Sequence, residues 1–215
     1  MPTSLEAIRQ KLKQRILVLD SAFDRHLIEP VVVQRVDKFA LQEGYVSALW
    51  QTWCSFCRDL LICSAQGAVT RAGNTTTSPF FGRSEMENAF VAKQLSQNNH
   101  VNAIRPLVGS HQEHTWGDLS KMNLVASGIG CSNSGEIFSG LSACLRIEDL
   151  QLCRNASAHI SRSTIHGVRT ARVRYQDTAF RHPTDMMMWV DPNSSDFLWK
   201  SWIDEIDLAS ELSIL

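Results

Sequence analysis

Apolar residues recur every three or four positions through most of this chain, and this spacing restricts its fold more than any other feature. In the first segment, residues 4–26, the pattern is carried by Leu5, Ile8, Leu12, Ile16, Leu19 and Phe23. Residues at this spacing share one face of an α-helix, which must pack against other elements. The same period covers residues 34–66, 85–97, 119–128, 133–141, 145–161 and the region after residue 194. The sequence predicts a mainly α-helical protein.

Polar residues in front of several of these segments are suited to cap the helices. The candidates are Ser4, Thr115 with Asp118 as a capping box, Asn133 or Ser134, and Ser194 or Ser195. Pro30 and a short apolar run at 31–33 separate the first two segments, and we expect Gly44 to break or kink the second.

Two stretches depart from the helical period. Residues 67–84 are rich in Gly, Thr, Ser, Asn and Pro, which predicts an exposed loop. This loop is either a mobile lid, an RNA-contacting loop or a plain connection whose phenylalanines pack on the core. For RNA contacts it offers Phe80 and Phe81 for stacking and Arg71 and Arg83 for phosphate. Residues 171–176 alternate and 186–190 are apolar, so we expect a small β-hairpin near residues 171–190, with a helix over 164–175 as the alternative.

Length and composition favour one soluble domain over residues 1–215. A chain of 215 residues with 44% hydrophobic residues can bury a substantial core. The N-terminal residues lack the uninterrupted apolar run of a signal peptide, and no stretch is long and uncharged enough to span a bilayer. We therefore expect a cytoplasmic protein without a membrane partner, with its six cysteines reduced.

Positive charge is concentrated in one part of the chain. Residues 154–182 carry a net charge of +5, whereas the whole chain carries -1. A basic segment within an otherwise acidic protein is typical of a localised phosphate-binding surface. We take residues 162–192, which follow the polar end of the segment 145–161, as this basic part of the domain. The candidate RNA-binding residues are Arg162, Arg169, Arg172, Arg174 and His166. In the alternative interpretation, these arginines pair with acids elsewhere on the surface.

The segment 145–161 has an apolar side with Leu145, Leu152 and Ile160, yet it ends in polar residues that include Arg154 and His159. Arginine carries a permanent charge on a planar group of donors, and histidine exchanges protons near neutral pH. At ~100° per residue, an uninterrupted helix would separate these two residues by about 140° around its axis. We therefore expect a second copy of the helix, in a dimer, to complete the site.

These residue types suit RNA cleavage without a metal or another cofactor. A histidine can take the proton of a ribose 2′-hydroxyl or protonate the leaving 5′-oxygen, and an arginine can stabilise charge on phosphorus. An alternative zinc site would use Cys54 and Cys57 with His111 and His114, although the helical spacing of the two cysteines favours a place in the core.

The sequence Arg154-Asn155-Ala-Ser-Ala-His159 resembles the R-x4-H motif of HEPN-domain ribonucleases. Those proteins are helical, commonly dimeric, and occur in bacterial toxin–antitoxin and antiphage systems and in RNA-guided effectors. The resemblance implies a HEPN-like helical bundle in which Arg154 and His159 are catalytic and Asn155 orients or contacts the phosphate. It also implies a homodimer and an antitoxin or defence-system partner protein. The alternative is a non-catalytic HEPN-like module that binds RNA, a nucleotide or a protein.

Overall fold

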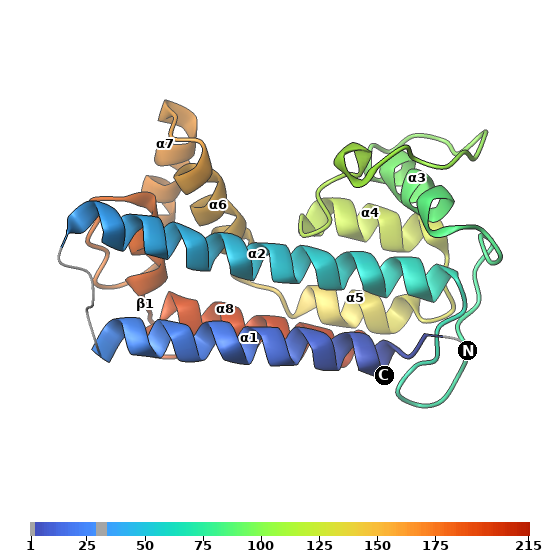
Figure 1. The fold of residues 1–215 in the computed structure, drawn as a ribbon, viewed down its shortest axis with the longest axis horizontal. Coiled ribbons are helices and arrows are strands. Elements are labelled where there is room, and N and C mark those ends of the chain that lie inside the picture. Colours follow the sequence, from blue (N-terminus) through green and yellow to red (C-terminus); the bar gives the residue numbers. More distant parts are fainter. Residues whose placement is uncertain (1–2, 29–33) are drawn as a thin grey trace. The chain divides into compact units, whose positions relative to one another are not determined.

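The computed structural model describes residues 3–28 and 34–215, so the apolar run at 31–33 lies outside the described residues. The protein is mainly α-helical, as the sequence predicts. Its α-helices are α1 (Leu5–Ile28), α2 (Arg35–Ala65), α3 (Glu85–Ser96), α4 (Leu119–Ile129), α5 (Ser134–Ser142), α6 (Ile147–Ala158), α7 (Arg162–Ala171) and α8 (Leu198–Leu212). Short 3-10 helices are η1 (Ser110–Gln112), η2 (Arg172–Arg174) and η3 (Pro183–Met188), and two strands, β1 (Val190–Asp191) and β2 (Asp196–Phe197), complete the fold (Figure 1).

The chain forms two compact units. The first unit comprises residues 1–12, 53–143 and 208–215, and the second comprises residues 13–52 and 144–207. Helices α1, α2 and α8 each contribute residues to both units.

In the first unit, α4 packs against both α3 and α5 (Figure 1). Ser84 begins α3 in a reciprocal capping box with Glu87, and the side chain of Asp118 caps α4 by accepting the N–H of Lys121. The expected box between Thr115 and Asp118 is wrong, because α4 begins after Asp118 rather than after Thr115.

Residues 67–84 form the predicted loop of the first unit, and most of them are exposed. The two arginines of the loop are engaged by carboxylates: Arg71 lies 2.9 Å from Glu6, and Arg83 lies 3.4 Å from Glu87. Phe81 is 65% exposed. The ion pairs offset the charges that the RNA-contacting interpretation of this loop requires.

The second unit is built on the last part of α1, the first part of α2 and the start of α8. The Tyr45 hydroxyl donates to the Ala22 carbonyl, joining α2 to α1 at 3.2 Å, and the Trp199 indole donates to Asp20 at 3.1 Å. The segment that contains η3 is tied to α2 because Thr184 Oγ1 donates to Gln42 Oε1 at 3.0 Å. All six tryptophans of the chain are buried.

The antiparallel hairpin lies later than expected. Val190 pairs with Phe197 and Asp191 with Asp196, whereas residues 171–190 form the end of α7, two 3-10 helices and a single antiparallel bridge between Gln176 and Val190. The alternative helix over 164–175 is closer to the structure. The expectation that Ser194 or Ser195 caps the last helix is wrong. Strand β2 lies between these serines and the first turn of α8. Helix α2 continues through Gly44 without the expected break.

No helix within residues 3–28 and 34–215 has the length and apolar composition needed to cross a bilayer. All six cysteines lie in this part of the chain and are free thiols.

Candidate active site at the end of α6

Helix α6 is shorter than its sequence pattern suggests, and this changes which face is apolar. Its buried side consists of Ile147, Leu150, Cys153 and Ala156. Leu145 and Ile160, expected on the apolar side, are 75% and 67% exposed. Both lie outside the helix, so the 3.6-residue period does not determine their orientation.

Arg154 and Asn155 occupy the last turns of α6, and both are half-buried. The guanidinium of Arg154 donates from Nη1 to Oδ1 of Asn155 at 3.1 Å. The hydroxyl of Ser157 donates to the Arg154 carbonyl at 3.0 Å, and this bond lies within the helix. Asn155 therefore restrains Arg154 through its side-chain carbonyl oxygen.

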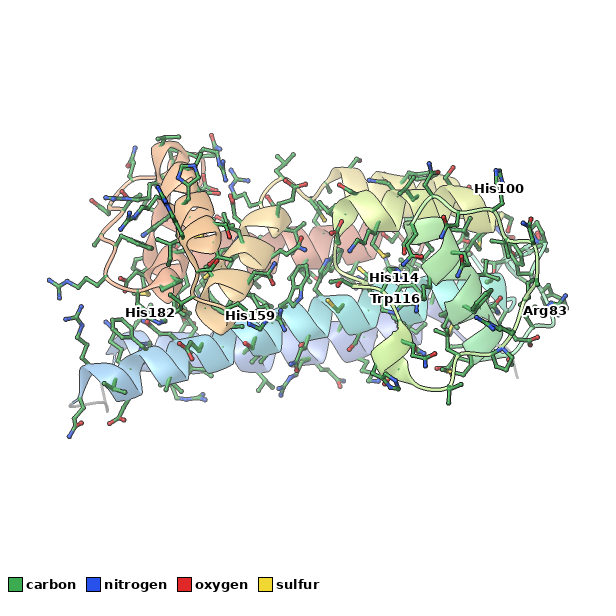
Figure 2. The ribbon with its side chains drawn as sticks, turned by 90° about the horizontal axis from the view of Figure 1, so that it is seen from above. Arg83, His100, His114, Trp116, His159 and His182 are labelled. Atoms are coloured by element: carbon green, nitrogen blue, oxygen red, sulfur yellow. The ribbon has the colours of Figure 1, made fainter. Side chains whose placement is uncertain are left out.

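His159 ends α6 and is exposed (Figure 2). Its φ of -138° and ψ of 78° are not helical, although its N–H still donates to the Asn155 carbonyl at 2.9 Å. The expected separation of 140° between Arg154 and His159 is therefore wrong, because it assumes that the helix continues through residue 161. In the described part of the chain, no hydrogen bond joins the two side chains.

The turn after His159 is held by the start of α7. Ser161 caps α7 in a reciprocal box with Thr164, whose hydroxyl also donates to the His159 carbonyl at 2.9 Å. Helix α7 then packs closely on α6: a Cβ atom at Gly167 would lie only 2.8 Å from Cδ1 of Leu152. These contacts set the position of α7 relative to the end of α6.

One face of α7 presents three of the predicted RNA-binding residues. Arg162, His166 and Arg169 are all exposed and are spaced four and three residues apart, as residues on one helix face are. Together with Ile160, Ser161 and Ile165 they line a surface depression of about 550 Å³. We call it the α7 depression.

The other two predicted RNA-binding arginines lie in η2. Arg172 reaches Thr178 Oγ1 at 3.4 Å, whereas Arg174 pairs with the buried carboxylate of Asp149 on α6. Tyr175 donates its hydroxyl to the same carboxylate, and burial together with this bond raises the pKa of the Tyr175 hydroxyl. The charge of Arg174 is thus offset, and its main contact in the chain is structural.

Asp149 is the residue of this region that sequence reasoning misses. It is only 5% exposed and connects α6 to Arg174 and Tyr175, which lie 25 and 26 positions later in the chain. Neither a helical period nor a local motif connects positions so far apart, so only the tertiary structure reveals the contact.

The alternative zinc ligands do not converge. Within the part of the chain that the structure describes, no group of three or more His, Cys, Asp or Glu side chains could hold a metal ion. Cys57 is buried in α2, as its helical spacing suggests, and His114 instead packs on Trp116 with ring centroids 4.1 Å apart (Figure 2).

Comparisons of the chain with protein-family models, with curated proteins and with solved structures found no match. Any functional conclusion therefore depends on the chemistry of the residues at the end of α6 and along α7.

Proposed function

We propose that the protein is a metal-independent endoribonuclease that cleaves RNA by attack of the ribose 2′-hydroxyl on the adjacent phosphate. The observation that carries this proposal is the combination of residues at the end of α6. Asn155 restrains Arg154 and His159 is exposed, while the residues that line the α7 depression, with its cationic side chains, start at Ile160, the next residue in the sequence. A proton-exchanging group beside an anion-binding surface is what this reaction requires.

Each of these residues has a role in the proposed reaction. One His159 imidazole takes the proton of the 2′-hydroxyl as the 2′-oxygen bonds to phosphorus and the bond from phosphorus to the 5′-oxygen breaks. The leaving oxygen takes a proton from a second imidazolium. Arg154 stabilises the charge on the phosphate oxygens, and Asn155 keeps the guanidinium in place. The products are a 2′,3′-cyclic phosphate and a 5′-hydroxyl.

The second imidazole comes from another copy of the chain in this proposal. A homodimer with two α6 ends facing one groove supplies two arginines and two histidines. The resemblance to HEPN-domain ribonucleases favours this arrangement, and it also favours a role as the toxin or effector of a bacterial toxin–antitoxin or antiphage system. Its activity is then controlled in the cytoplasm by an antitoxin or defence-system partner.

The decisive experiment incubates the purified protein with RNA in EDTA and identifies the ends of the products by mass spectrometry. We expect cleavage to survive chelation, to spare DNA, and to fall by at least about a hundredfold in Arg154→Ala and His159→Ala, since each removes a group acting at the transition state. His100→Ala is the matched control because His100 is an exposed histidine of the first unit. RNA that stays intact under all conditions would contradict the proposal.

The second candidate is a non-catalytic module that binds RNA, a nucleotide or a protein through the same surface. It is favoured by one observation, the absence of a hydrogen bond between Arg154 and His159 in the described chain. Equal RNA binding by the wild type and His159→Ala, with no cutting by either, would support this candidate.

A further inference from the structure

The second unit has another surface depression, formed by the first turns of α2 and by the segment from Asp177 to Trp189. Its volume is about 530 Å³. The side chains that line it include three cations, two acids and two aromatic rings, namely Arg35, Lys38, Arg181, Asp177, Asp185, Phe39 and Trp189. We call it the α2 depression.

The three cations of the α2 depression are exposed and have no carboxylate partner among the residues that the structure describes. Of the two acids, Asp185 is hydrogen-bonded to the backbone. Its Oδ2 accepts the backbone N–H groups of Arg181 at 2.6 Å and His182 at 2.8 Å. Unpaired cations around a concave surface attract anions more strongly than cations neutralised by ion pairs.

An aromatic floor gives the α2 depression a defined shape. Phe39 stacks on His182 with ring centroids 4.4 Å apart, and Arg35 lies over the Phe39 ring at 5.5 Å from its centroid. Nε2 of His182 lies 3.2 Å from the Glu43 carboxylate, which attaches the ring to α2. Cations beside aromatic side chains are typical of grooves that hold single-stranded nucleic acids.

Contacts within the second unit connect this depression to the α7 depression. Arg169, which lines the α7 depression, lies over Phe180 at 5.8 Å from the ring centroid. Phe180 in turn packs against Trp189, a lining residue of the α2 depression, with centroids 6.5 Å apart. A single phosphate would need only one of the two sites. Cations at both sites, joined through one aromatic contact, favour an extended polyanion.

We propose that Arg35, Lys38 and Arg181 bind the phosphate backbone of a single-stranded RNA whose neighbouring nucleotides contact the α7 depression. The inference rests on the proposed function because it extends the path of the same substrate. Phosphate contacts of this kind hold the strand in position and add affinity without sequence preference. The α2 depression therefore strengthens binding of long strands, while the chemical step remains with Arg154 and His159.

The test measures fluorescence anisotropy of a labelled single-stranded RNA of mixed sequence in a His159→Ala background, in which the strand is not cut. We expect Arg35→Ala combined with Arg181→Ala to weaken binding roughly tenfold and to reduce the slope of log Kd against log salt concentration by about 0.7 for each phosphate that is no longer neutralised. Lys38→Ala should act in the same direction. Lys13→Ala combined with Arg15→Ala is the matched control, because it removes two charges from α1 of the same unit at positions that line neither depression.

Binding that is unchanged in the Arg35 and Arg181 double variant, or reduced equally in the control, would overturn the proposal. A duplex of the same sequence that binds as tightly as the single strand, with the same sensitivity to the double variant, would also overturn it. A cleavage assay with protein that retains His159 distinguishes the failure of this inference from the failure of the ribonuclease proposal. If RNA binds through the α2 depression and is never cut, the ribonuclease proposal alone fails; if RNA is cut and the double variant binds normally, this inference alone fails.

Discussion

At the scale of single residues, His114 of the first unit is held in an environment that disfavours its charged form. Both ring nitrogens are buried without a hydrogen-bond partner among the described residues, and the ring packs on Trp116. Burial, reinforced by the charge of Lys121, lowers the pKa of His114 to about 4, although the carboxylates of Glu113 and Asp118 act in the opposite direction. The unfolded chain binds a proton at this residue near pH 6.5.

This difference predicts how stability depends on pH. Between pH 6.5 and about 4 the unfolded state binds more protons at His114 than the folded state, so the free energy of unfolding decreases as the pH falls. The loss amounts to at most about 3 kcal/mol by pH 4. Urea unfolding at several pH values should show a weaker dependence for His114→Phe than for the wild type. His111→Gln is the control, because His111 is an exposed histidine close to His114 in the sequence. An identical pH dependence of stability in all three proteins would contradict the lowered pKa of His114.

At the scale of elements, the contact between α5 and α8 in the first unit depends on a missing side chain. A Cβ atom at Gly140 would clash with the Ala209 carbonyl and with the Ser213 side chain, and the Ala209 backbone cannot move without displacing α8. Gly135, in the first turns of the same helix, has nothing within 4 Å of its Cβ position. The two glycines of α5 therefore form a matched pair.

Gly140→Ala should lower the free energy of unfolding by roughly 2–4 kcal/mol, because overpacking forces the two helices apart. Gly135→Ala should leave stability unchanged or raise it by up to about 1 kcal/mol, since alanine favours the helix more than glycine does. Thermal denaturation followed by circular dichroism compares the two. Equal effects of both substitutions would show that α5 and α8 are not in this close contact.

At the scale of the whole molecule, the central question is whether one chain or two complete the proposed active site. Unfolding and refolding an equal mixture of the wild type and His159→Ala creates mixed dimers that carry a single His159. If the reaction needs the imidazoles of both chains, only the wild-type dimers, about one quarter of all dimers, are active, and the mixture has about one quarter of the ribonuclease activity of the same amount of wild type. If each chain supplies all the groups of its own site, the mixture keeps about one half.

Several features could be read from the sequence because they depend on local patterns. The period of apolar residues predicts α1, whose Leu5, Leu12, Ile16, Leu19 and Phe23 are buried. The polar end of α6 and the cations on one face of α7 also follow from neighbouring positions, since residues three, four and seven apart share a helix face. What such patterns predict poorly are element ends. Leu145 and Ile160 continue the apolar pattern, yet they lie outside α6.

The segment at the end of α6 thus illustrates both kinds of information. The residue types Arg154, Asn155 and His159, and therefore the candidate chemistry, are determined by the sequence alone. The tertiary structure decides that His159 lies beyond the helix and that Arg174 is paired with Asp149. It also decides that Arg35 of α2 lines the same depression as Arg181. These relations depend on contacts between residues far apart in the chain, which no local period encodes.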